Sequence, residues 1–207
     1  MSISNLSLAQ IAALPTTVIQ GLSVTDIQEL SSTQVGAINT SGIAVIDATQ
    51  LAALSSTQVR GLTATQIPVL SASLVFDTNQ LLVLNSNQFA SLTTTQLLAF
   101  DTTHVSVISA SQLGALSATN FSALDATQIG VLTATQLKGL TAAEIAGLTT
   151  TDVGEFADTQ IAALSAAQVK ALPSTNVSAL DATQVAALTE TQVKGLTAAQ
   201  IAGLTTT

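Results

Sequence analysis

The sequence predicts an all-α solenoid built from very short helices, one for each repeat of eight residues. Three observations predict this fold. The phrase L-[ST]-x-[TS]-Q-[VI]-x-[AG] recurs almost throughout the 207 residues. Within the phrase, a Ser or Thr and a Gln have the spacing of the capping box that starts a helix. Apolar residues stand at positions 1 and 6, on either side of that cap.

The octads follow one another along nearly the whole chain. They begin at Leu6 and recur every eight residues to Leu62, and they recur again from Phe76 to Leu196. Position 2 reads as the helix N-cap and position 5, which is Gln in 16 of 24 full octads, as the residue whose side chain reaches back to it. Positions 1 and 6 then form the hydrophobic staple. Each octad is predicted to be one helix of about six or seven residues.

The predicted core consists of the residues at positions 1 and 6, and the predicted helix caps are the residues at position 2. In the middle of the chain, the core residues are Leu124, Ile129, Leu132, Leu137, Leu140, Ile145, Leu148 and Val153. The caps of the same segment are Asp125, Thr133, Thr141 and Thr149. One octad buries too little apolar surface to fold alone, so neighbouring coils must pack on one another.

A β-solenoid is the alternative fold, because the octads are rich in Val, Ile and Thr. Strict alternation fails, however: if the residue at position 1 points inward, the residue at position 6 points outward. One continuous helix is disfavoured, because an eight-residue repeat advances roughly 80° past two full turns.

We expect a single octapeptide-repeat solenoid over residues 1–207, with one irregular segment at 68–76. Pro68 falls late in its octad, where a helix would lose a hydrogen bond. The unit that begins at Leu70 is two residues short. The segment therefore predicts a kink or register reset, or a hinge between two sub-arrays.

The repeat leaves open whether two or three octads make one turn of the solenoid. Asp77, Asp101 and Asp125 are 24 residues apart, so three octads per turn would stack them in a ladder. Like charges in a ladder repel one another unless cations bind between them. The spacing favours two octads per turn, or else a weak calcium site at these three residues.

Composition excludes several classes of function. The net charge is −8 with only four Lys and Arg, which argues against a nucleic-acid partner. No apolar run is long enough to insert into a membrane. The chain has no cysteine and no catalytic motif, and its one histidine, His104, replaces Gln at position 5. We expect no enzyme activity and no cofactor, and we interpret His104 as a polar capping substitute.

The octad L-[ST]-x-[TS]-Q-[VI]-x-[AG] resembles the octapeptide arrays of large bacterial secreted or cell-surface proteins of the adhesin type. The resemblance covers nearly the whole chain. It implies an extracellular or cell-surface location, reached by a non-classical or type I route because the N-terminus has no positively charged signal region. A cytoplasmic location is the alternative.

The first hypothesis for function is a structural repeat protein, which acts as a rigid stalk or spacer or assembles end to end into a filament. Self-similar ends predict self-association through the solenoid ends. The alternatives are a binding module that uses a Thr-bearing face to bind ice or a repetitive polymer, and a scaffold for a protein partner.

Overall fold

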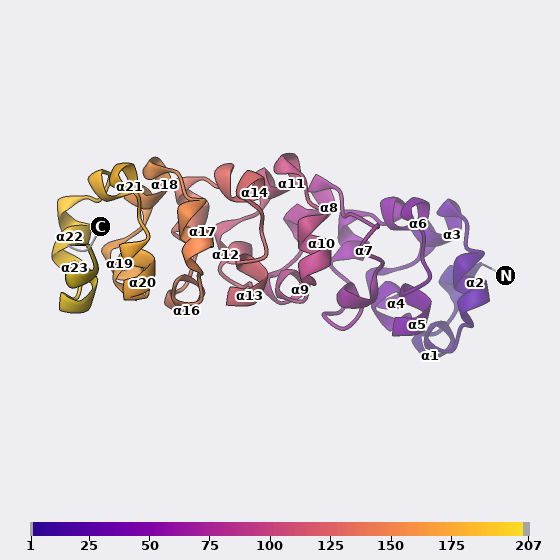
Figure 1. The fold of residues 1–207 in the computed structure, drawn as a ribbon. Helices are drawn as coiled ribbons and strands as arrows, with labels where there is room; N and C mark the ends of the chain where they lie inside the picture. Colours follow the sequence, from indigo (N-terminus) through magenta and orange to yellow (C-terminus); the bar gives the residue numbers. More distant parts are fainter. Residues whose placement is uncertain (1, 205–207) are drawn as a thin grey trace. The chain divides into compact units, whose positions relative to one another are not determined.

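A computed structural model describes residues 2–204 and confirms the all-α solenoid. These residues form 23 α-helices of four to seven residues and two short 3-10 helices (Figure 1). No β-strand occurs within the described range, so the β-solenoid alternative is wrong. The contacts group into two compact units, Met1–Phe100 and Asp101–Thr207.

Each helix occupies one octad. The helices of the first unit are η1 (Ile3–Asn5), α1 (Leu8–Ala12), α2 (Thr16–Gln20), α3 (Val24–Glu29), α4 (Ser32–Ala37), α5 (Thr40–Ile43), α6 (Ala48–Ala53), α7 (Ser56–Val59), η2 (Ile67–Val69), α8 (Thr78–Val83), α9 (Ser86–Ala90) and α10 (Thr94–Leu98). The helices of the second unit are α11 (Thr102–Val107), α12 (Ala110–Leu113), α13 (Ala118–Phe121), α14 (Ala126–Gly130), α15 (Ala134–Leu137), α16 (Ala142–Ala146), α17 (Thr150–Gly154), α18 (Asp158–Ala163), α19 (Ala166–Ala171), α20 (Ser174–Ser178), α21 (Ala182–Ala186), α22 (Glu190–Gly195) and α23 (Ala198–Leu204).

The eight-residue period arises from a helix followed by two extended residues. Between α3 and α4, Leu30 has φ −67° and ψ 137°, and Ser31 has φ −70° and ψ 160°. Both residues therefore leave the helical region, and the chain turns a corner there. No residue in the described range has a positive φ, so none of these corners requires a left-handed glycine.

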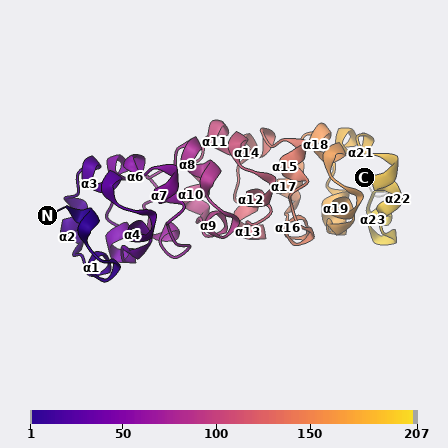
Figure 2. The ribbon, with the colours of Figure 1, turned by 180° about the vertical axis from the view of Figure 1, so that it is seen from behind.

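Three octads make one turn of the solenoid in both units. Within each unit, helices pack on the helix three octads later, as α1 packs on α4 in the first unit and α16 on α19 in the second. Figures 1 and 2 show this stacking of helices from opposite sides. The inference that favoured two octads per turn is therefore wrong.

The side chains at positions 1 and 6 form a continuous core inside each unit. In octads covered by coils on both sides, the position 6 side chain is 0 to 2% exposed, as Ile129 and Leu137 illustrate at 0%. The position 1 leucines that alternate with them are also buried. The predicted core residues Leu124, Ile129, Leu132, Leu137, Leu140, Ile145, Leu148 and Val153 are all buried.

The irregular segment at 68–76 lies inside the first unit and retains its place in the solenoid. Pro68 is accommodated in the 3-10 helix η2, and Leu70 and Phe76 are buried on either side of the shortened unit. The Leu74 amide donates to the Ser71 carbonyl at 2.9 Å and closes a turn where a helix would otherwise stand. The six-residue unit thus fills one full octad position, and α7 packs on α8 across it.

Glycine permits the closest approach between coils at two equivalent places. A Cβ atom on Gly139 would overlap the carbonyl oxygen of Ala110, and one on Gly114 would overlap the carbonyl of Gly139. The same relation holds in the first unit, where a Cβ on Gly61 would overlap the carbonyl of Ser32. At these positions the backbones of successive coils meet without intervening side chains.

Candidate functional site

The most distinctive side chains in the molecule are the buried glutamines at position 5. Gln136, which is 4% exposed, accepts a hydrogen bond from the Thr133 amide through Oε1 at 2.8 Å. Its Nε2 donates to the carbonyls of Val105 and Ile108, at 2.9 and 2.8 Å, in the preceding coil. One side chain therefore starts its own helix and also binds the C-terminal end of a helix in the preceding coil, which here is α11.

This arrangement recurs with a constant sequence separation. The two carbonyl acceptors lie 31 and 28 residues before the glutamine, as for Gln58, Gln160, Gln168, Gln184 and Gln192. Across the six-residue unit the separations fall to 29 and 26, as for Gln80 and Gln96. The two missing residues change the count but leave the contact intact. We call this set of bonds the glutamine ladder.

Where position 5 lacks an amide, a neighbouring residue can replace it. Gly42 has no side chain to donate, and a Cβ there would lie 2.9 Å from Cγ2 of Ile38. The N-cap of the same octad, Asn39, accepts from the Gly42 amide at 2.8 Å and donates through Nδ2 to the Ala12 carbonyl at 2.8 Å. Asn39 thus supplies both the cap and the bond between coils.

When the N-cap residue is proline, the side chain at position 5 has no N-cap amide from which to accept a hydrogen bond. Proline has no backbone N–H, so no acceptor is needed for it. The residues at position 5 after the two capping prolines, Pro15 and Pro173, are Val18 and Asn176 rather than Gln. Asn176 still donates to the Leu148 carbonyl at 2.7 Å. The two positions therefore vary together for a physical reason.

Two carboxylates occupy the same buried place as glutamine. Asp152, 7% exposed, accepts from the Thr149 amide at 2.6 Å and from the Ser122 hydroxyl of the preceding coil at 2.5 Å. Glu144, 2% exposed, accepts from the Thr141 amide at 2.6 Å, but its Oε1 has no partner. Burial raises the pKa of Glu144, against the lowering effect of its bonds to Thr141.

A third carboxyl group lies near Asp152. Burial raises the pKa of the half-buried Glu155, and the charges of Asp152 and Asp125 raise it further. Even so, the described residues contain no group of three or more carboxylate, histidine or cysteine side chains arranged to hold a metal ion.

The predicted caps lie where helices begin. The side chains of Asp125, Thr133, Thr141 and Thr149 each accept from the amide three residues later, at 2.8 to 3.3 Å. Among the weak calcium candidates, Asp77 caps α8 in the first unit and Asp101 and Asp125 cap α11 and α14 in the second. Helices α11 and α14 pack on one another, so Asp101 and Asp125 lie on stacked octads.

His104 takes part in the cap of its own helix. Its Nδ1 lies 2.6 Å from Oδ1 of Asp101, the N-cap of α11. The hydrogen bond from the His104 amide, followed by the bond and charge of the His104 ring, lowers the pKa of the exposed Asp101. These contacts agree with a capping role for His104.

The threonines at position 4 form exposed rows on stacked helices. Thr135, Thr159 and Thr183 lie on α15, α18 and α21, which pack in that order, and all three are exposed. The hydroxyl of Thr183 donates to Oδ1 of the capping Asp181 at 2.6 Å. In this row, the Thr183 hydroxyl is thus already bonded to a helix cap.

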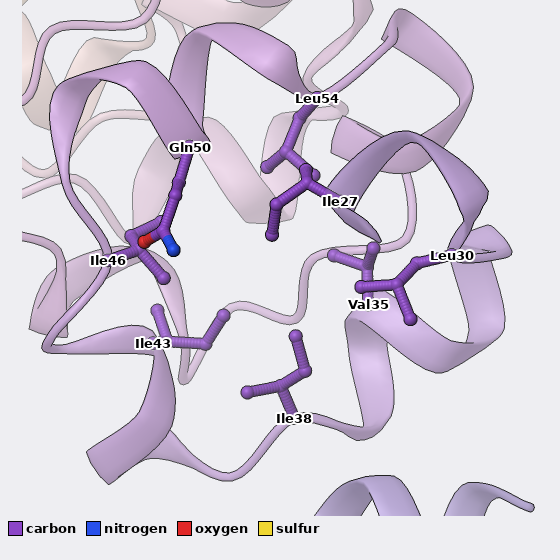
Figure 3. A pocket seen from close by; sticks show the side chains of 8 residues that line it. All are labelled: Ile27, Leu30, Val35, Ile38, Ile43, Ile46, Gln50 and Leu54. Carbon is purple, nitrogen blue, oxygen red and sulfur yellow. The ribbon is translucent and has the colours of Figure 1, made fainter. Parts of the chain in front are cut away.

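The hollows found in the described residues differ in kind. One is an internal void of about 10 Å³, enclosed by seven aliphatic side chains and Gln50 (Figure 3). It has no room for an organic ligand. The other is a surface depression of about 390 Å³, lined by Leu180, Asp181, Ala182, Val185 and Leu204 beside the last described coil.

That last coil, formed by α21, α22 and α23, has exposed core-type side chains. Val193 and Ile201 stand at position 6, which is buried elsewhere, and are 46 and 49% exposed. The exposed face of this coil therefore presents apolar side chains and the carbonyls at its helix ends. In inner coils, the next coil covers such side chains and the glutamine ladder binds such carbonyls.

The sequence predicted that the glutamine caps its own helix, but the bond that it makes to the preceding coil was not predicted. A signal was present in the residue choice. Glu serves a capping box as well as Gln does, yet position 5 has Gln in 16 octads and Glu only at Glu144. A preference for the amide over the acid indicates that the Nε2 donor is also required.

No family model, curated protein or solved structure matches this chain. None of the helices within residues 2–204 combines the length and apolar character needed to cross a membrane.

Proposed function

We propose that this chain is a structural repeat protein, a solenoid that acts as a stalk or spacer or as the subunit of an end-to-end assembly. The observation that supports the proposal best is the glutamine ladder. Within each unit, it binds successive coils to one another through buried hydrogen bonds, around an apolar core.

A second point in favour is what the repeated side chains are used for. Most of the polar groups conserved from octad to octad, at positions 2 and 5, bond to the protein's own backbone. These groups therefore stabilise the helices and the contacts between coils, and they are not free to bind a ligand. A function that depends on mechanical continuity uses these bonds directly.

Self-association would use the coil faces. Inside each unit, one face of a coil offers amide donors and the other offers carbonyls and the apolar position 6 side chains. Val193 and Ile201 present such an apolar face. The first coil would meet it with Gln10, Val18 and Asp26 at position 5, so only one of its three octads carries the amide donor. We therefore propose weak, concentration-dependent association.

Negative-stain electron microscopy of the purified chain across a concentration series tests this proposal. Filaments of constant width that lengthen with concentration are expected, together with their loss in Val193→Lys/Ile201→Lys. Particles of one length at every concentration would refute assembly and leave the stalk or spacer role. Compact particles with no long axis would refute both roles.

The exposed threonine rows favour one alternative, a module that binds ice or a repetitive polymer. Thermal hysteresis that disappears in Thr135→Lys/Thr159→Lys would establish it. For location we propose the extracellular space or cell surface, with cytoplasm as the alternative, and fractionation of the producing cells decides between them.

A further inference from the structure

The buried acid Glu144 stands in a place built for a hydrogen-bond donor. In the octad that precedes it along the chain and in the octad that packs on it from the next coil, the corresponding residue is an amide that bonds to the coil below. Gln168 and Gln136 each donate to carbonyls 31 and 28 residues earlier. By the same register, the carbonyls 31 and 28 residues before Glu144 are those of Leu113 and Leu116.

An ionised carboxylate cannot make this contact. It only accepts hydrogen bonds, and the groups that it faces are also acceptors. Oε2 of Glu144 is satisfied by the Thr141 amide at 2.6 Å, while the buried Oε1 has no partner. A protonated carboxyl group would donate its O–H to one of the carbonyls and restore the bond between coils.

No charged neighbour relieves the problem. The helices that pack on α16 are α13 and α19. Helix α13 carries no titratable side chain, the only one on α19 is the exposed Lys170, and α16 itself has only Glu144. No cation therefore faces Glu144 from these elements to stabilise a negative charge.

Asp152 shows how the chain treats an acid that remains an acceptor. There a hydroxyl of the preceding coil, that of Ser122, is turned towards the carboxylate at 2.5 Å. The residue in the equivalent place before Glu144 is Gly114, which has no side chain to donate. The environment of Glu144 thus lacks the donor that Asp152 has.

We propose that the protonated carboxyl group of Glu144 donates a hydrogen bond that joins the coils of α13 and α16. This contact weakens when the group ionises. The sign follows from linkage. Folding raises the pKa of Glu144 above its ordinary value of 4.5, so its stabilisation is fully present below that value and is lost as the pH rises through the folded pKa.

The test compares Glu144→Gln with the wild-type chain by urea unfolding at about pH 4.5 and about pH 8. The amide restores a permanent donor, so the variant should differ little at the lower pH and be more stable at the higher one. The ratio of the two unfolding constants should change about tenfold for each unit by which folding raises the pKa. Other titrating groups are present in both chains and cancel in this ratio.

The reciprocal variant Gln66→Glu creates the same arrangement at a second octad, where the N-cap is Thr63 and the residue in the equivalent place of the preceding coil is Gly36. It should lose more stability at the higher pH than at the lower. Infrared spectroscopy of the folded wild-type chain, at a pH above the ordinary glutamic acid range, should also show a protonated carboxyl band that Glu144→Gln lacks. A stability difference for Glu144→Gln that is the same at both pH values, or absence of that band, would overturn the proposal.

Discussion

Replacement of Gln58 by alanine measures what the glutamine ladder contributes to stability. Gln58 is 4% exposed and accepts from the Ser55 amide at 2.9 Å. It donates to the Ile27 and Leu30 carbonyls at 2.6 and 2.7 Å. Gln58→Ala therefore leaves three backbone groups without this partner in a buried environment.

The expected loss follows from these three groups. A buried polar group left unsatisfied costs about 1 to 3 kcal/mol. The Ile27 carbonyl still accepts from the Leu30 amide, so its share is at the low end. We expect Gln58→Ala to lower the free energy of unfolding by about 3 to 5 kcal/mol.

Gln10→Ala is the matched control in the same unit. Gln10 also reaches back to a serine N-cap, accepting from the Ser7 amide at 2.9 Å, but it is exposed and its described bonds stay within the capping box. Water can replace that single bond, so the expected loss is about 0.5 to 1.5 kcal/mol. The difference between the two variants isolates the donation between coils.

Urea unfolding followed by far-ultraviolet circular dichroism is the assay, because the chain has no Trp or Tyr to serve as a fluorescent probe. The slope of free energy against urea should be unchanged, which would show that the same surface is exposed on unfolding. If Gln58→Ala costs no more than Gln10→Ala, the bonds between coils do not stabilise the solenoid and the reasoning is refuted.

Three further predictions concern other contacts. Gly139→Ala places a Cβ against the Ala110 carbonyl and should lower the free energy of unfolding by about 1 to 3 kcal/mol, measured by thermal unfolding. The Cβ of Gly154→Ala meets nothing within 4 Å, so this control variant should raise the free energy of unfolding by up to about 1 kcal/mol. Equal effects would contradict the close approach of the coils. Pro173→Ser with Asn176→Gln should be more stable than the sum of the single changes predicts, because only the pair restores the capping box, and additivity in a double-mutant cycle would argue against it. Hydrogen bonds lower the pKa of Asp26, Asp101 and Asp181, so their stabilisation is present above the ordinary value of 3.8 and is lost as the pH falls through the folded values. The melting temperature should therefore fall as the pH is lowered below 3.8, and it should fall less steeply in Asp101→Asn than in the wild-type chain.

The caps and the core could be predicted from the sequence because both are local. Ser31 and Gln34 are three residues apart, and the bonds between them do not depend on the rest of the fold. The number of octads per turn is not local. It is set by contacts such as that of Gln58 with Leu30, 28 residues earlier, which the repeat alone does not specify.

Charge repulsion between stacked carboxylates does not prevent three octads per turn. Asp101 and Asp125 are not bare charges in a ladder. Each carboxylate instead accepts the amide of its own helix at 3.0 or 2.8 Å, and both side chains are exposed to water, which screens the remaining charge. Stacked N-caps are therefore compatible with three octads per turn without a bound cation.

The six-residue unit at Leu70 was predicted to be a kink, register reset or hinge, and the glutamine ladder continues across it. The acceptors of Gln80 and Gln96 lie two residues nearer in sequence but occupy the same places in the coil below. What the solenoid requires of a unit is a buried residue at each corner and a carbonyl for the next glutamine. Leu70 and Phe76 meet the first requirement, and the Leu70 carbonyl meets the second.

The same requirement accounts for most departures from Gln at position 5. Each octad must satisfy an N-cap amide and the carbonyls of the coil below, so a change at one position needs a change at another. Asn39 compensates for Gly42, and Ser122 supplies the donor that Asp152 lacks. Glu144 has no such compensation among its described contacts, which leaves the proton as the group that completes its octad. A permanent amide at that position should therefore make the stability of its coil contact independent of pH.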